Sequence, residues 1–91
     1  MELLTQEQVD AELAGTPGWS QDGTSIVTVA ARKDFRDALL FVNAVGYLAE
    51  RAGHHPDVQI QWNKVTLELS THSAGGLTVA DFALARQISA L

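Results

Sequence analysis

Apolar residues recur along this chain at two spacings, and each spacing predicts a different element. Between Asp34 and Gly53 they return every three or four residues, which predicts one long amphipathic helix capped by Asp34 and ended by Gly53. The residues on its apolar face are Phe35, Ala38, Leu39, Val42, Val45, Leu48, Ala49 and Ala52. Within residues 58–62 and 65–72, apolar and polar residues alternate instead, as in half-buried strands. We therefore expect the helix to lie across a sheet.

Capping signals predict two shorter helices near the ends of the chain. Thr5 and Gln8 have the spacing of a capping box, and Gly15 is expected to end this first helix in the left-handed conformation. Thr78 and Asp81 repeat the spacing and begin a last helix that runs to the C-terminus.

Turn signals divide the predicted strands into two hairpins. Asp22-Gly23 separates residues 19–21 from 25–31, and Asn63-Lys64 separates the two alternating strands. The predicted order is α-β-β-α-β-β-α over one domain, residues 1–91. Hairpins interleaved with helices predict an α+β fold, with a four-stranded antiparallel sheet and three helices packed on one face.

The register of the second hairpin determines which polar residues meet. A two-residue turn at 63–64 pairs Trp62 with Val65, so that apolar residues face apolar ones along the strands. Continued outward, this register places His55 opposite His72, with β-carbons about 4.5 to 5.5 Å apart. We therefore expect these two imidazoles to share one end of the polar face.

Composition and charge exclude several classes of protein. The chain has 91 residues, no Cys and a net charge of −5, with the acidic excess confined to its first 22 residues. Without Cys there is no disulfide or thiolate nucleophile, so we expect a reducing, cytoplasmic location. No apolar run approaches the roughly 20 residues that span a bilayer. No basic face is present to bind nucleic acid.

A chain this small buries only about 60 to 70% of its unfolded surface, which favours self-association.

The chain's three histidines, His54, His55 and His72, all flank the open end of the second hairpin. An imidazole exchanges protons near neutral pH, because its ordinary pKa is about 6.5, and a cluster of three suits general acid–base catalysis. Hydrogen-bonded loop histidines are the alternative interpretation. Because extended neighbours such as His54 and His55 project oppositely, and neither an HExxH motif nor Cys is present, we expect no catalytic metal.

Four other residues are candidates with competing structural roles. Glu50 could orient an imidazole or simply be solvated on its helix, and Asp81 could support a histidine or only cap the last helix. Trp19 and Trp62 are expected in packing more than in ligand binding. No glycine-rich loop of the GxGxxG or GxxxxGK[ST] type is present, so no nucleotide cofactor is expected.

These residues resemble the pterin-4a-carbinolamine dehydratases, a family also known as dimerisation cofactors of a homeodomain transcription factor. The resemblance covers nearly the whole chain, and Trp19 matches a position that the family commonly fills with Trp. Its motifs are Glu-x-x-x-His-His-Pro at 50–56, aromatic-Asn-Lys at 62–64, Leu-Ser-Thr-His at 69–72, Gly-Leu at 76–77 and Asp81.

The resemblance implies a lyase that needs no cofactor or metal. Its substrate would be 4a-hydroxytetrahydrobiopterin, or a bacterial pterin equivalent, left after an aromatic amino acid hydroxylase has used the tetrahydropterin. By the family's pattern, His54 and His72 are the acid–base pair and His55 binds and orients the pterin. Glu50 and Asp81 would support the histidines or hold the ring.

The resemblance also implies a homodimer or homotetramer. The edges of the predicted sheet and an apolar tail around Leu84, Ile88 and Leu91 offer a route to self-association. The alternative function is a non-catalytic protein-binding or dimerisation cofactor on the same fold, and the acidic first helix is the feature that favours it.

The chain departs from the family's pattern at three positions. Val58 stands where many animal members have Trp, Trp62 stands where Tyr is frequent, and Ala80 replaces an Arg that often precedes the Asp. The loss of that Arg changes how the pterin is held, and Trp62 or Trp19 is expected to supply an aromatic wall instead.

Overall fold

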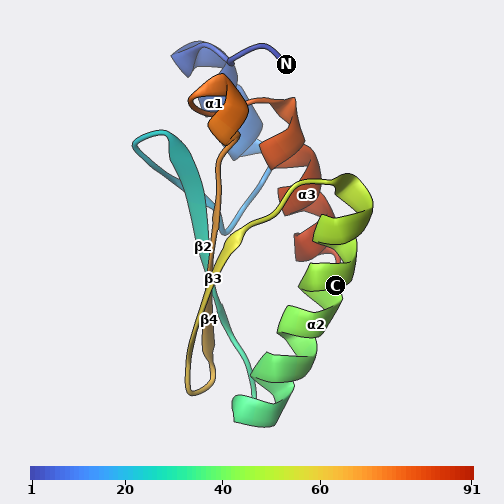
Figure 1. Cartoon of the computed structure of the whole chain (residues 1–91). Coiled ribbons are helices and arrows are strands. Elements are labelled where there is room, and N and C mark those ends of the chain that lie inside the picture. Colours follow the sequence, from blue (N-terminus) through green and yellow to red (C-terminus); the bar gives the residue numbers. More distant parts are fainter.

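A four-stranded antiparallel sheet in the order β1-β2-β4-β3 carries the helices on one face, as the edge-on view of Figure 1 shows. The computed structural model describes all residues 1–91. The elements in chain order are α1 (Gln6–Ala14), β1 (Ser20–Asp22), β2 (Ser25–Ala31), α2 (Phe35–Ala52), β3 (Asp57–Gln61), β4 (Lys64–Leu69), the 3-10 turn η1 (His72–Ala74) and α3 (Val79–Ser89). The predicted α+β class and element order are confirmed. No helix combines the length and apolar character needed to cross a membrane.

Each helix begins at the residue that its capping signal predicts. Thr5 and Gln8 form the capping box of α1, and Thr78 and Asp81 form that of α3. Asp34 caps α2 by accepting a hydrogen bond from the N–H of Asp37. These side chains satisfy N–H groups that the helices themselves leave without partners.

Two helices end at the glycines that the sequence predicts, but only one of these glycines is in the left-handed conformation. Gly53 ends α2 in the left-handed region with φ 62°, as expected for a glycine after the last turn. Gly15 ends α1 with φ −95°, so the predicted left-handed end is wrong there. The Gly15 N–H still reaches the carbonyl of Glu12, so the helix closes with an ordinary turn instead.

The core lies between the sheet and the helices. Val65, Leu67 and Leu69 on β4 are fully buried, and α3 contributes Leu84 and Ile88 at 1% and 4% exposure. The prediction that Leu84 and Ile88 form an apolar tail for self-association is therefore wrong, because the apolar stripe of α3 is used within the chain. Only Leu91 of that group is exposed.

The register of the second hairpin differs from the prediction by two residues. β3 and β4 pair Val58 with Leu67 and Ile60 with Val65, so the turn residues are Trp62 and Asn63. A two-residue shift keeps every side chain on its predicted face, which is why alternation alone did not reveal it. The ladder ends at Asp57, and the predicted pairing of His55 with His72 is wrong.

Asn63 gives a physical reason for this register. Its carbonyl accepts from the Arg32 N–H at 2.7 Å, and its side-chain amide donates to the Arg32 carbonyl at 2.9 Å. These bonds hold Asn63 beside the end of β2. They therefore favour the Trp62-Asn63 turn over the Asn63-Lys64 turn that the sequence suggested. In the first hairpin Asp22 pairs with Ser25, so the turn residues are Gly23 and Thr24, one position later than the predicted Asp22-Gly23.

The shifted turn places Trp62 in the left-handed region, with φ 50°. A non-glycine residue there costs roughly 1 to 2 kcal/mol. We expect Trp62→Gly to be more stable than Trp62→Ala by about 1 kcal/mol, since both variants lose the ring and only glycine relieves the backbone. Chemical denaturation of the two variants measures this difference. Equal unfolding free energies would contradict the turn assignment.

Candidate functional site

His54 is held by a buried carboxylate. It follows the left-handed Gly53, and its backbone N–H reaches the Ala49 carbonyl at 3.1 Å, so the end of α2 fixes its position. Its Nε2 lies 2.6 Å from Asp81 Oδ1, and the two side chains are 15% and 0% exposed. An ionised carboxylate only accepts hydrogen bonds, so opposite a charged Asp81 the hydrogen of this contact lies on Nε2, and Nδ1 is the ring nitrogen left for a ligand.

Asp81 is itself fully satisfied by its surroundings. Its Oδ2 accepts from the Thr71 hydroxyl at 2.8 Å and from the Thr78 N–H at 2.9 Å. The hydroxyls of Thr71 and Thr78 lie 2.8 Å apart. A buried carboxylate without such donors would be strongly destabilising, so these contacts allow Asp81 to lie in the core.

His55 points to a different carboxylate in a different environment. Its Nε2 lies 2.9 Å from Glu50 Oε2, and the two side chains are 63% and 80% exposed. Glu50 also borders an open depression of about 510 Å³ on α2, lined by Asn43, Gly46 and Tyr47. His54 thus belongs to a buried pair and its neighbour His55 to a solvated pair. The solvated pair contributes little to stability.

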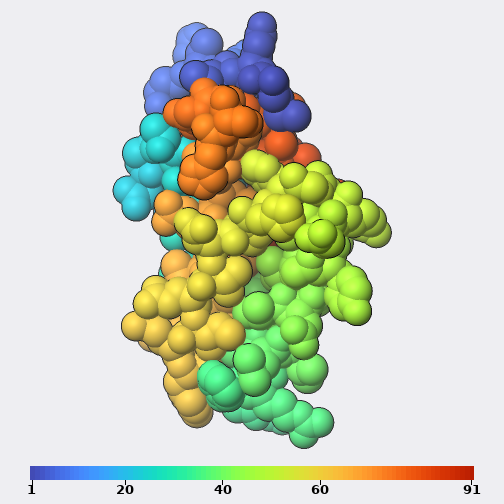
Figure 2. All heavy atoms as spheres, in the orientation of Figure 1, coloured from blue at the N-terminus to red at the C-terminus, as the bar shows by residue number.

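His72 lies at the start of η1, directly after Thr71, and its side chain is exposed. The loop that bears it is closed by a bridge between Thr71 and Gly76, with the Thr71 N–H 2.9 Å from the Gly76 carbonyl. The His72 ring makes no hydrogen bond to the other two histidines. It is connected to His54 only through Thr71 and Asp81. Figure 2 shows the orange atoms of this segment above the yellow-green atoms of the α2–β3 connection, on the same face of the molecule.

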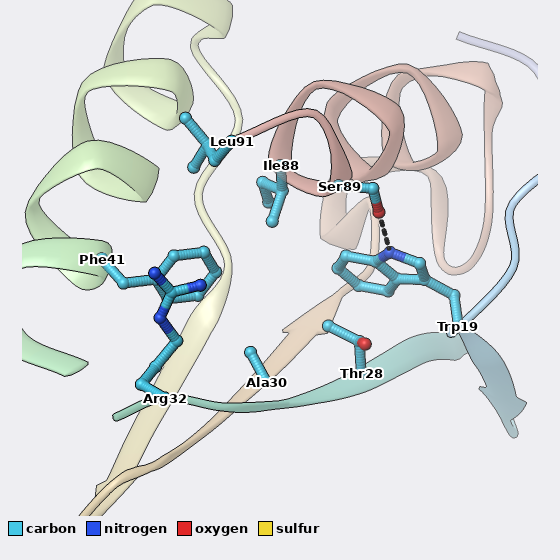
Figure 3. A pocket seen from close by; sticks show the side chains of 8 residues that line it. All are labelled: Trp19, Thr28, Ala30, Arg32, Phe41, Ile88, Ser89 and Leu91. Carbon is cyan, nitrogen blue, oxygen red and sulfur yellow. Dashed lines mark hydrogen bonds between the residues drawn. The ribbon is translucent and has the colours of Figure 1, made fainter. Parts of the chain in front are cut away.

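Neither tryptophan lies beside the histidines. Trp19 is buried, donates from Nε1 to Ser89 Oγ at 3.0 Å and lines a cavity of about 160 Å³. Figure 3 shows this cavity between β2, α2 and the C-terminal end of α3, bordered by Phe41, Ile88 and Leu91. Trp62 is 66% exposed at the turn of the second hairpin. The length of β3, about 13 Å from Asp57 to Gln61, separates it from the open end of that hairpin.

A second charged cluster stabilises the opposite end of α2. Asp37 accepts from the Lys33 N–H at 2.9 Å and lies 3.2 Å from Arg32 Nε, whose guanidinium also covers the Phe41 ring. The Lys33 hydrogen bond, followed by the Arg32 side chain, lowers the pKa of Asp37 below its usual value. The charged form therefore favours the folded state at neutral pH, and this contribution is lost as acid protonates Asp37. The cluster is about 20 Å from the histidine end of the helix.

Thr71 lies in this site although no sequence pattern was taken to indicate it, and Thr78 contacts the site although the spacing predicted it only as a helix cap. The buried alternation of Val65, Leu67 and Leu69 continues to Thr71, which is 8% exposed. A polar residue at an inward position needs a buried partner, and that signal was available in the sequence. Thr78 was recognised only as a helix cap, although its backbone N–H and hydroxyl both belong to the Asp81 environment.

The arrangement can move protons. His54 contributes an imidazole bonded to the buried Asp81 carboxyl group, and His72 contributes a second imidazole from the loop that follows Thr71. Such a pair suits a reaction in which one group is protonated while a proton leaves a neighbouring atom. No three His, Cys, Asp or Glu side chains converge closely enough to hold a metal ion.

Comparison with known proteins finds one family over nearly the whole chain. The family model described as pterin 4 alpha carbinolamine dehydratase matches residues 2–91. A Nocardia farcinica protein with a provisional pterin-4-alpha-carbinolamine dehydratase name is 49% identical over 90 residues, which cover 99% of this chain and 95% of the relative. A Thermomicrobium roseum protein with the same provisional name is 45% identical over 91 residues, covering 100% and 98%.

Solved structures give the same fold. A crystal structure from Brucella melitensis, described as a transcriptional coactivator/pterin dehydratase, superposes with a TM-score of 0.91 at 31% identity, covering 96% of this chain and 95% of that one. A pterin dehydratase-like protein, described as a RuBisCO assembly factor in the alpha-carboxysome, gives a TM-score of 0.64 at 20% identity, covering 79% and 83%. At that identity the second likeness supports the fold alone.

The two histidine–carboxylate pairs should differ sharply in their effect on stability. We expect Asp81→Asn to lower the free energy of unfolding by about 3 kcal/mol, because an amide nitrogen would face buried donors. The matched substitution Glu50→Gln should change it by less than about 0.5 kcal/mol, since that pair is solvated. Urea denaturation measures both. Similar losses in the two variants would show that the Asp81 pair is not the buried anchor of the site.

Proposed function

This chain belongs to the pterin 4 alpha carbinolamine dehydratase family of hydro-lyases, and we propose that it dehydrates 4a-hydroxytetrahydrobiopterin, or a bacterial pterin equivalent, by histidine acid–base catalysis. The observation that supports this mechanism most strongly is the 2.6 Å hydrogen bond between His54 Nε2 and buried Asp81. Asp81 also accepts a hydrogen bond from Thr71, the residue that precedes His72, and these three residues form one hydrogen-bonded unit. This unit joins the two histidines that the family's pattern assigns to proton transfer.

The proposed reaction breaks the bond between C4a and its hydroxyl and removes the proton on N5. The leaving hydroxyl takes a proton and departs as water, while the N5–H electron pair forms the double bond between C4a and N5. The product is the quinonoid dihydropterin. No oxidant or reductant is consumed, so the reaction needs no redox cofactor.

We assign the base to His54 and the acid to His72. With its hydrogen held on Nε2, neutral His54 presents the Nδ1 lone pair to N5–H, and the Asp81 carboxylate stabilises the imidazolium that forms. His72, exposed at the start of η1, would protonate the leaving hydroxyl. We assign His55 and Glu50 to binding and orienting the pterin, next to the open depression that Glu50 borders.

The proposed activity also implies which classes of enzyme act before and after this reaction, and in which compartment. A 4a-hydroxypterin is formed when a tetrahydropterin-dependent hydroxylase inserts oxygen into an aromatic substrate, so an enzyme of that class would supply the substrate. A reductase would then regenerate the tetrahydropterin. We place the protein in the cytoplasm, because a chain without Cys gains nothing from an oxidising compartment.

Rate measurements on chemically generated 4a-hydroxytetrahydropterin test the proposal directly. We expect the protein to accelerate formation of the quinonoid product, and His54→Ala and His72→Ala each to lower kcat by about 100-fold or more, the usual contribution of a proton-transfer group. Arg36→Ala, on the exposed start of α2, is the control and should keep the full rate. Equal rates with and without protein would refute the activity. Full activity in both histidine variants would refute the mechanism.

Protein binding is the second candidate function. The Brucella melitensis relative is described as a transcriptional coactivator as well as a pterin dehydratase. In this chain α2 exposes Leu39, Leu40 and Tyr47 at 43%, 56% and 81%. A docking role would give a stable complex that survives substitution of the histidines, whereas the enzymatic role requires them.

We also propose that the protein is a homodimer or homotetramer. The sheet ends in two uncovered strands, β1 and β3, and the exposed apolar side chains of α2 form a second unpartnered surface. Burial of these surfaces would offset the small core of a 91-residue chain.

Analytical ultracentrifugation tests the assembly and its surface. We expect a multimer at micromolar concentration and a smaller species for Leu40→Glu, because a charge on the α2 surface would be desolvated in an interface. Val29→Glu is the matched control. It is similarly exposed, at 59% against 56%, but lies on the uncovered face of the sheet. A monomeric native protein would contradict the proposal, and dissociation by Val29→Glu alone would place the interface on the sheet.

A further inference from the structure

Thr71 connects the two histidines assigned to proton transfer. Its side chain donates to Asp81 Oδ2, and the other oxygen of that carboxylate contacts His54 Nε2. Its backbone begins the loop that carries His72, and the bridge to Gly76 fixes it at the base of that loop. The side chain and backbone of one residue therefore contact the supports of both histidines.

The hydrogen bonds around Thr71 run in one direction. A hydroxyl has a single hydrogen, and that of Thr71 is directed to Asp81 Oδ2 at 2.8 Å. The 2.8 Å contact between the Thr71 and Thr78 hydroxyls must then use the hydrogen of Thr78. Thr78 Oγ1 in turn accepts from the Ala80 N–H at 3.2 Å. The resulting chain runs from Ala80 through Thr78 and Thr71 to Asp81, and each bond polarises the next.

This chain fixes the orientation of the Asp81 carboxyl group. Two donors, the Thr71 hydroxyl and the Thr78 N–H, meet on Oδ2, so Oδ1 must be directed at His54. With only one donor on Oδ2, the carboxyl group could rotate about its Cβ–Cγ bond, and the hydrogen of His54 would no longer be held on Nε2. Thr71, Thr78 and Asp81 are 8%, 0% and 0% exposed, so water does not readily replace a missing donor.

We propose that Thr71 is a positioning residue for the reaction, holding Asp81 so that His54 keeps its hydrogen on Nε2 and offers Nδ1 to the pterin. This inference rests on the proposed dehydratase activity for its consequence in catalysis. Its structural part, the tautomer of His54, can be measured without substrate.

Three variants separate positioning from stability. Thr71→Val keeps the shape and removes the hydroxyl, and Thr71→Ser keeps the hydroxyl. Thr16→Val removes another buried threonine hydroxyl, which donates to the Glu12 carbonyl at the end of α1, so it causes comparable structural damage away from Asp81. Measurements are made well below the unfolding temperature of every variant.

The first readout is ¹⁵N NMR of the His54 ring, assigned with the His55→Ala and His72→Ala variants. We expect neutral wild-type His54 to carry its hydrogen on Nε2, with Thr71→Ser and Thr16→Val unchanged. Thr71→Val should shift the two nitrogen signals towards each other as the tautomers mix. A hydrogen on Nδ1 in the wild type, or a Thr71→Val spectrum identical to the wild type, would overturn the proposal.

The second readout is dehydration kinetics. We expect Thr71→Val to lower kcat on the order of tenfold with KM changed by less than about twofold, because an acid–base group is misplaced while substrate contacts remain. Thr71→Ser and Thr16→Val should stay within about threefold of the wild type. Equal losses in Thr71→Val and Thr16→Val would show a merely structural role and overturn the proposal. If the wild type itself is inactive, the proposed function fails, and the NMR result still decides the role of Thr71.

Discussion

The buried carboxylate of Asp81 is the constraint on which this structure depends. Its two oxygens accept hydrogen bonds from three segments: the connection after α2 through His54, the segment after β4 through Thr71, and the N-cap of α3 through Thr78. A carboxylate in the core is tolerated only when donors surround it, so these segments must converge for the chain to fold. The same requirement brings His54 and the His72 loop to one face, which links folding to chemistry.

The environments of the two histidine–carboxylate pairs explain how neighbouring histidines can have different roles. His54 lies against a buried acceptor, which holds the Nε2 side of its ring. His55 lies beside Glu50 in solvent, where both side chains can adjust to a ligand. A proton-transfer group benefits from fixed geometry, whereas a binding group benefits from accessibility.

Most of the fold could be predicted from local signals, because caps, turns and periodicity act over a few residues. Thr5, Asp34 and Thr78 cap the starts of their helices as predicted. The apolar residues that alternate along β4 face the core, as the sequence indicates. The hairpin register could not be predicted in this way. It depends on the bonds of Asn63 to Arg32, which is 31 residues away in the sequence, and a two-residue shift leaves the hydrophobic pattern unchanged.

The candidate site was predicted only in part, for the same reason. Sequence spacing drew attention to the histidines, Glu50 and Asp81, and hairpin geometry suggested that His55 and His72 would meet. In the structure, contacts between distant segments divide the histidines differently, and the Asp81 side chain that caps α3 also receives His54. A residue that satisfies a helix end and a histidine of the candidate site at once cannot be assigned from either pattern alone.

A structure of the protein with bound biopterin would test the central claim most directly, since oxidised biopterin has the ring system of the substrate and cannot be dehydrated. The account predicts that the C4a–N5 edge of the ring lies within hydrogen-bonding distance of His54 Nδ1 and the His72 ring, with His54 Nε2 still bonded to Asp81. A pterin bound elsewhere, such as in the cavity beside Trp19, with His54 and His72 free of contact, would contradict it.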